Sequence, residues 1–275
     1  MTERKFSRIK QWTYLPDGRR VERIIALRDF GNVKSGTIGG FIEYDENLSH
    51  DGVCWIADNA IAAGQSRVSQ NALLRDRAMI DGRTMVSGSA IIQDDAFLYK
   101  NVFAYENSVV GLKSYLTDGV TVSGNSRIFC NYRYNKSGRL RLPNLCGLAE
   151  TRDFARLEGA ISVNDRCIIA GNAIVRGDVK LCDRVRVDDN AIVENIAFLA
   201  DDVWITQSSR VGGRSKIVGC CVIGGNAKIR GTSYLLCNVQ VAGQSIVENK
   251  TYSGDVLLIR NSECGIRNYE SAFRL

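Results

Sequence analysis

Small and apolar side chains return every six residues along most of this chain. Residues 54–131 divide into thirteen such units, and residues 155–250 divide into sixteen more. The third position is Val, Ile or Leu in 27 of the 29 units, with Ala62 and Ala104 as the exceptions. The first position is Ala, Ser, Thr, Cys or Val in 28 of them, so both columns keep one phase. A period this regular indicates a repeat architecture.

Each unit reads as a short strand followed by a corner. Positions 1 and 3 alternate with an outward position 2, which is the period of a strand. Positions 5 and 6 are rich in Gly, Asn and Asp, as in Asp58-Asn59 and Gly124-Asn125, and these residues favour turns. Three such sides close a triangular parallel β-helix in which residues 18 apart stack. At three units per coil, the 29 units predict roughly ten coils.

The ends of the chain and one internal segment depart from the repeat. Residues 1–53 predict an N-terminal β cap, because strand-like runs flank the turn signal Pro16-Asp17-Gly18. The coil is expected in two blocks, 54–131 and 155–250. Residues 251–275 predict a C-terminal cap, in which the run 256–259 covers the last coil.

Residues 132–154 interrupt the two blocks and predict an extruded loop. Long loops on rigid scaffolds often carry binding groups. Tyrosine rings and basic side chains suit a planar or phosphorylated ligand. The candidate binding residues are Tyr132, Arg133, Tyr134, Lys136, Arg139 and Arg141. An idle loop, or one that packs in an oligomer, is the alternative.

The outward position 2 of the first block carries apolar stripes. Such stripes on a prism surface indicate a buried interface, so a homo-oligomer, in particular a homotrimer, is expected. The predicted interface residues are Trp55, Leu73, Ile91 and Val109 on one side and Ile61, Met79, Phe97 and Tyr115 on the next.

Composition narrows the chemistry. The nine cysteines are odd in number and include no Cys-x-x-Cys, and His50 is the only histidine, so neither a disulfide framework nor a metal site is expected. His50, with Asp51 beside it, is the only candidate for a histidine general base, and a turn histidine bonded to the backbone is the structural alternative.

Charge and hydropathy bear on partners and location. Residues 1–34 hold nine Lys or Arg and four Asp or Glu, so this segment carries +5 of the chain's net charge of +6. A basic end can meet nucleic acid, but solvated charge on a cap is the favoured interpretation. The chain lacks an apolar run of about 20 residues and begins with a polar segment, which predicts a cytoplasmic protein without a membrane segment.

Several N-terminal motifs carry a resemblance to a known family. They are residues 25–34, 39–43 and 47–49, followed by Cys54-Trp55. This pattern resembles the start of YdcK-type proteins, which are bacterial and phage-encoded hexapeptide-repeat proteins. The resemblance implies a single-stranded left-handed β-helix similar to that of the trimeric hexapeptide acyltransferases. Active acyltransferases of that type carry a catalytic histidine on a coil, whereas the 29 repeat units here contain none.

Three functions remain open from the sequence. The favoured one is a β-helix scaffold or binding protein that recognises a small molecule or a protein partner, with no cofactor. The second is an acyltransferase of the hexapeptide type with acyl-CoA as co-substrate, which the missing coil histidine opposes. The third is a phage or host interaction factor that binds nucleic acid or a nucleotide through the basic end, for which solvated charge on the cap is the favoured alternative.

Overall fold

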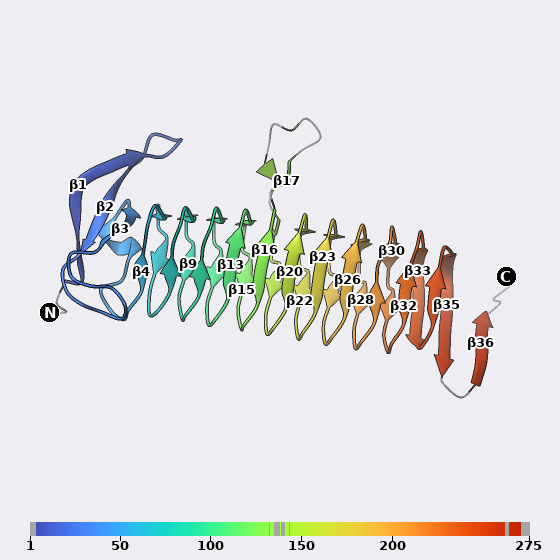
Figure 1. Ribbon diagram of the computed structural model, residues 1–275. Coiled ribbons are helices and arrows are strands. Elements are labelled where there is room, and N and C mark those ends of the chain that lie inside the picture. The colour runs from blue at the N-terminus through green and yellow to red at the C-terminus, as the bar shows by residue number, and fades with distance from the viewer. Residues whose placement is uncertain are drawn as a thin grey trace. The chain divides into compact units, whose positions relative to one another are not determined.

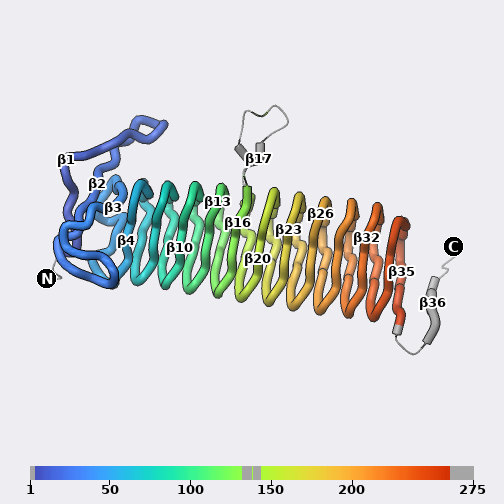
Figure 2. The backbone as a smooth tube through the Cα atoms, viewed as in Figure 1, coloured from blue at the N-terminus to red at the C-terminus, as the bar shows by residue number. Residues whose placement is uncertain are grey.

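The chain divides into two compact units, Met1–Pro143 and Asn144–Leu275. The structure, a computed structural model, describes residues 4–131, 133–134, 138, 141–142, 144–261 and 264–270, without the side chains of 133–134, 141–142, 261 and 264–270. In both units most of the described residues form an all-β parallel coil of short strands, as the hexapeptide period predicts, and antiparallel strands stand at the two ends. Figure 2 shows the backbone of each unit winding in regular turns.

The first unit opens with the predicted hairpin cap (Figure 1). Strand β1 (Phe6–Tyr14) pairs antiparallel with β2 (Arg20–Ala26), and the turn between them contains Gly18 at φ +86°. Strand β2 pairs antiparallel with β3 (Ile38–Ile42), which in turn runs parallel to the first coil strand of its sheet. A single 3-10 turn, η1 (Asp45–Asn47), follows. The cap therefore continues directly into the coil.

Three stacks of strands form the coil of the first unit, here called faces A, B and C. Face A consists of β5 (Ile61–Ala62), β8 (Met79–Asp81), β11 (Phe97–Tyr99) and β14 (Tyr115–Thr117). Face B consists of β6 (Arg67–Val68), β9 (Met85–Val86), β12 (Phe103–Ala104) and β15 (Thr121–Val122). Face C consists of β4 (Trp55–Ile56), β7 (Leu73–Leu74), β10 (Ile91–Ile92), β13 (Val109–Leu112) and β16 (Arg127–Cys130).

Residues 18 apart pair in register on every face, as expected for three six-residue sides per turn. Met79 pairs with Phe97 on face A, and Trp55 pairs with Leu73 on face C. Third-position residues such as Ile80 and Leu98 have no exposed surface. Each such aliphatic side chain contributes about 2 kcal/mol before conformational entropy is subtracted.

The corners explain why Gly and Asp recur at the fifth position. Gly88 has φ +68°, and a Cβ there would lie 2.5 Å from the backbone nitrogen of Glu106 in the next turn. Asp58 and Asp76 also adopt positive φ, and each carboxylate accepts a hydrogen bond from the backbone N–H 18 residues later, at 3.1 Å. These aspartates therefore satisfy backbone donors at the turns.

The second unit repeats the same three-sided pattern. One stack consists of β19 (Glu150–Thr151), β22 (Ile168–Ile169), β25 (Arg186–Val187), β28 (Trp204–Ile205) and β31 (Val222–Ile223). Another consists of β20 (Arg156–Gly159), β23 (Ile174–Gly177), β26 (Ile192–Asn195), β29 (Arg210–Val211), β32 (Lys228–Arg230) and β34 (Ile246–Glu248). The third consists of β21 (Ser162–Val163), β24 (Lys180–Leu181), β27 (Phe198–Ala200), β30 (Lys216–Gly219) and β33 (Tyr234–Gly243).

The C-terminal run predicted to cover the last coil is part of a long strand. Strand β35 (Thr251–Asn261) pairs in parallel with β33, and β36 (Cys264–Glu270) pairs antiparallel with β35. Residues 256–259 lie within β35. The parallel pairing of β35 extends the coil before the antiparallel strand ends it.

The boundary of the extruded loop differs from the sequence expectation of 132–154. Leu145 forms a parallel bridge with Val163, and Glu150–Thr151 pairs with Ile168–Ile169, so the described residues from Asn144 onward are coil. The period is hidden there because Thr151 fills a third position that is aliphatic in the other units. The coil has about 12 turns rather than roughly ten, because this segment, β3 and β35 also stack in parallel. Strands β17 (Arg133–Tyr134) and β18 (Arg141–Leu142) pair antiparallel.

Candidate ligand-binding cleft

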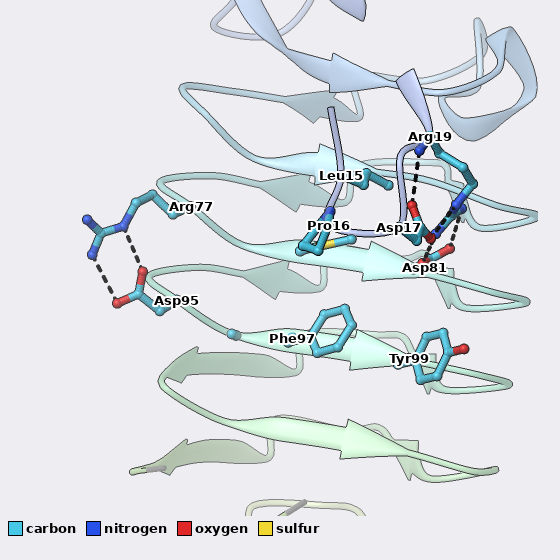
Figure 3. Close-up of a pocket in the computed structure, with 11 residues that line it drawn as sticks. Leu15, Pro16, Asp17, Arg19, Arg77, Asp81, Asp95, Phe97 and Tyr99 are labelled. Atoms are coloured by element: carbon cyan, nitrogen blue, oxygen red, sulfur yellow. Dashed lines mark hydrogen bonds and ion pairs between the residues drawn. The ribbon is translucent and has the colours of Figure 1, made fainter. Parts of the chain in front are cut away.

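A cleft of about 420 Å³ lies in the first unit, between the hairpin turn of the cap and face A of the coil. Figure 3 shows Leu15 and Pro16 of the turn on one side and Phe97 and Tyr99 of β11 on the other. Its size, and its mixture of apolar walls with a few polar groups, match small-molecule sites in general. The lining residues are Leu15, Pro16, Asp17, Arg19, Arg77, Met79, Asp81, Asp95, Ala96, Phe97 and Tyr99.

Apolar packing holds the hairpin turn against face A. Leu15 and Val21 are buried with Phe41 and Ala63 in one hydrophobic cluster, and Ile61 and Met79 pack against it. The cleft begins where this cluster ends. It is therefore formed between two parts of the chain that the core itself positions.

The side chain of Arg19 fastens the turn on its polar side. Its Nε lies 2.7 Å from Asp17 Oδ2, Nη1 lies 2.8 Å from Glu43 Oε2, and Nη2 lies 2.5 Å from Asp81 Oδ2. The side chains of Glu43 and Asp81 are each only 8% exposed. The hydrogen bond to Asp81 is the main reason that the pKa of Arg19 is raised above its ordinary value. The guanidinium is thus committed to three carboxylates.

Aromatic side chains form the other wall. Phe97 stacks on Tyr115, with ring centroids 5.2 Å apart, and on Tyr99, with centroids 5.7 Å apart. Pairing between β11 and β14 sets Phe97 beside Tyr115, and the alternation along β11 puts Tyr99 on the same outward surface. These three rings are called the aromatic ladder below.

A second ion pair closes the remaining edge of the cleft. Arg77 Nε lies 2.7 Å from Asp95 Oδ1, and its terminal nitrogen donates to Asp95 Oδ2 at 3.0 Å (Figure 3). The two residues are 18 apart, so the repeat places them on neighbouring corners. The lining therefore combines apolar and aromatic walls with two groups of ion-paired side chains.

His50 lies outside the cleft, in a turn and bonded to the backbone, as the structural alternative from the sequence describes. Its Nδ1 accepts a hydrogen bond from the backbone N–H of Lys5 at 3.2 Å, and its ring stacks on Phe6 with centroids 4.5 Å apart. Burial, together with the nearby Arg4, lowers the pKa of His50 below its ordinary value. The backbone N–H of Asp51 donates to Ser49 Oγ. These contacts join the cap to the first coil.

The loop candidates lie mostly outside the described residues. Tyr132, Lys136 and Arg139 are not described, and Arg133, Tyr134 and Arg141 are described only as backbone in β17 and β18. A binding role for this loop therefore remains a prediction.

The cap itself covers part of the apolar stripe proposed as an interface. Trp55 is only 4% exposed and makes an edge contact with Phe30, while Ile61 and Met79 pack against the hairpin cluster. The expectation that Trp55 meets another subunit is corrected by its burial, whereas Ile61 and Met79 stay partly exposed beside the hairpin cluster. The other stripe residues, Leu73, Ile91, Val109, Phe97 and Tyr115, are partly exposed.

Internal contacts engage most of the basic side chains near the N-terminus. The set with an ion pair, a backbone contact or a buried position comprises Arg4, Lys5, Arg8, Arg19, Arg20, Arg23 and Lys34. Lys5 has no exposed surface, and Arg8 lies 2.8 Å from Asp45. Five of these side chains pair with carboxylates, whereas Lys5 and Arg23 contact backbone oxygens, so much of the basic charge is engaged within the cap and first coil.

The cysteines of the inner column behave as small apolar side chains. Cys54, Cys167 and Cys221 are fully buried, and burial raises the pKa of Cys167 to about 12. Within the described part of the chain, three or more His, Cys, Asp or Glu side chains nowhere gather as they would around a metal ion. The same residues include no helix with the length and hydropathy needed to span a membrane.

The polar residues of the cleft were not identified from the sequence. Asp17 and Arg19 belong to a predicted turn, and Asp81 and Tyr99 occupy the fourth position of their units, 18 residues apart. The polar and aromatic side chains at the fourth position could have marked this side of the coil as a candidate site. The contact between Asp81 and Arg19, 62 residues earlier, depends on how the hairpin folds over face A.

Comparisons with known proteins give a short sequence match and distant structural ones. No family model matches the chain. It is 40% identical over 67 residues to the "Uncharacterized acetyltransferase YdcK" of Escherichia coli (strain K12), a match over 22% of this chain and 21% of that protein. The chain thus spans about a fifth of the curated relative it matches.

Two solved acyltransferases are distant structural neighbours. The UDP-N-acetylglucosamine O-acyltransferase (LpxA) from Moraxella catarrhalis RH4 is 17% identical, with a TM-score of 0.34 over 74% of this chain and 71% of that chain. The Arabidopsis UDP-N-acetylglucosamine acyltransferase is 14% identical, with a TM-score of 0.31 over 84% and 72%.

Proposed function

We propose that this protein is a hexapeptide-repeat binding scaffold that holds a small molecule in the cleft between the hairpin turn and the aromatic ladder. The observation that carries the proposal is the pairing of an apolar turn, Leu15-Pro16, with the partly exposed ring of Phe97 across a 420 Å³ cleft. An aromatic side chain fixed by its neighbours loses little freedom when a ligand binds.

The rigidity of the walls supports this role. Arg19 ties the turn to Glu43 and Asp81, and the buried cluster around Leu15 holds it from the other side. A preformed cleft binds without first paying the entropy of closing a loop. A binding role for the extruded loop stays a separate prediction from the sequence.

The test is a thermal-shift screen of a small-molecule library against three proteins. These are the wild type, Phe97→Leu, which removes the ring in the cleft, and Phe103→Leu, a matched control at the same repeat position on face B. Ligands of the cleft stabilise the wild type and Phe103→Leu but lose most of their effect on Phe97→Leu. Hits that act equally on all three proteins would place binding elsewhere.

Acyl transfer is the second candidate, because the 67-residue match is to a protein described as an acetyltransferase. His50 would have to serve as the base, although its Nδ1 is engaged by the backbone of Lys5. An assay that measures release of free CoA from acetyl-CoA, by transfer or hydrolysis, tests the acyltransferase hypothesis. Release by the wild type that disappears in His50→Gln would favour the enzyme over the scaffold.

A further inference from the structure

We infer that the cleft selects an organic cation with a flat or apolar portion, such as an arylalkylammonium, rather than a phosphate-bearing or other anionic ligand. This inference rests on the proposed binding function of the same cleft and adds the chemical class of its ligand. It follows from the charges that line the cleft, from how its guanidinium groups are engaged, and from the rings on its wall.

Carboxylates outnumber cationic groups around the cleft. Its lining contains the carboxylates of Asp17, Asp81 and Asp95 against the guanidinium groups of Arg19 and Arg77. Glu43, which shares Arg19, adds a fourth carboxylate at 2.8 Å from that guanidinium. Lys100, which lies against the Tyr99 ring, is itself paired with Asp118 at 3.4 Å, so the local balance stays negative although the whole chain carries +6. Low-dielectric walls strengthen such a local field.

The two guanidinium groups are already bound to carboxylates. Arg19 directs its nitrogens to Asp17, Glu43 and Asp81, and Arg77 forms a two-point contact with Asp95. A phosphate or carboxylate ligand would have to compete with these pairs and would meet uncompensated negative charge. An incoming cation instead adds a partner to oxygens that retain unused lone pairs.

The aromatic ladder adds attraction of the same sign. The face of an aromatic ring is negative, so it attracts ammonium groups, especially where solvent is partly excluded. The structure already contains one such contact at the ladder, because Lys100 Nζ lies 5.4 Å from the centroid of the Tyr99 ring. Phe97, held between Tyr99 and Tyr115, offers its ring together with the apolar surface of Met79 and Pro16.

The experiment compares three probes of similar size by isothermal titration calorimetry. Benzyltrimethylammonium is the cation, benzyl alcohol is the neutral analogue and benzylphosphonate is the anion. The wild type is expected to bind the cation at least tenfold more tightly than the neutral probe, and the anion most weakly. Raising the salt concentration should weaken binding of the cation, because part of the attraction is electrostatic.

Variants connect the preference to the cleft. Asp95→Asn removes one carboxylate from the edge and should weaken binding of the cation several-fold, while Phe97→Leu should weaken it at least as much. The controls are Glu158→Gln, which makes the same change in net charge at an exposed position of the second unit, and Phe103→Leu on face B. Both controls should leave the affinity unchanged.

The outcomes separate this inference from the proposed function. If the neutral or anionic probe binds at least as tightly as the cation, and this binding is lost in Phe97→Leu, the cleft is a binding site and the cation preference is wrong. If the cation binds equally to the wild type and Phe97→Leu, or does not bind, the inference is also overturned. The proposed function then depends on the library screen alone.

Discussion

Arg19 in the hairpin turn and Asp81 at the end of β8 form an ion pair across 62 residues of sequence, with Nη2 2.5 Å from Oδ2. The backbone N–H of Gly82 donates to the other oxygen of Asp81, which fixes the carboxylate from the coil side. Through this pair the cap is attached to the coil at the mouth of the cleft. The stability of the cap and the shape of the cleft are therefore linked through one guanidinium.

Replacing Arg19 with Ala should destabilise the first unit and open the cleft. Removal of the guanidinium leaves Glu43 and Asp81 close together and largely buried without a counter-charge. Arg19 is itself one-third exposed, so the expected cost lies between those of surface and buried pairs, about 2 kcal/mol. Urea unfolding measures this cost. Arg75→Ala removes two exposed contacts, with Asp76 at 3.7 Å and with Gln93 Oε1 at 2.6 Å, so it should change stability by less than about 0.5 kcal/mol and is the control. Equal effects of the two changes would contradict the anchoring role.

Replacing Val187 with Asp should cost several kcal/mol in the second unit. Val187 occupies a third position on β25 and has no exposed surface, so the new carboxylate would be buried without a partner. Thermal unfolding followed by circular dichroism checks this. Lys180→Asp, at an exposed second position on β24, is the matched control and should unfold close to the wild type. An unchanged melting temperature in Val187→Asp would mean that the inward register is wrong.

The stability of the first unit should depend on the protonation of His50. Its folded pKa is lowered below the ordinary value of 6.5 because burial disfavours the imidazolium. Between the folded and the unfolded pKa of His50, the unfolded chain binds more protons than the folded one, so stability rises with pH. The stability that comes from keeping His50 neutral in the fold is fully present above pH 6.5. It is lost as the pH falls from 6.5 through the lowered pKa of the folded state.

Urea unfolding at pH 7.5 and at successively lower values tests this dependence. His50→Phe keeps a ring beside Phe6 but cannot titrate, so its stability should fall less between pH 7 and the lowered pKa than that of the wild type. Because His50 is the only histidine, no other side chain of that type contributes. Parallel pH profiles for the two proteins would refute the assignment.

A homo-oligomer should form through the partly exposed stripe on face C. Leu73, Ile91 and Val109 stack at intervals of 18 residues and do not line the cleft. Introducing Leu73→Lys together with Ile91→Lys should give monomers in light scattering, because the interface would bury two unpaired ammonium groups. Met85→Lys with Phe103→Lys, at the same repeat positions on face B, is the control that keeps the wild-type state. A wild-type protein that is monomeric at high concentration would contradict this prediction.

The hexapeptide period alone determined the coil, its register and its core. Val187 and Ile80 could be placed inside, and Met79 beside Phe97, because each six-residue unit makes its own strand and corner and neighbouring turns repeat the same contacts. Local signals also located the hairpin at Pro16-Asp17-Gly18. The period became unreadable only near Thr151, where a polar residue occupies an inward position.

Only the tertiary structure decided where the cleft lies and which surface stays available. The fold of the hairpin over face A brings Arg19 to Asp81 and packs the hairpin cluster against Met79, and no repeat spacing connects a cap residue to a coil residue. Trp55, an interface candidate from the sequence, is instead buried against Phe30 of the cap, and Ile61 packs against the hairpin cluster while staying partly exposed. Repeats specify interactions between positions separated by a fixed number of residues. A site formed by a non-repeating cap depends on the path of the chain in space, which the period does not encode.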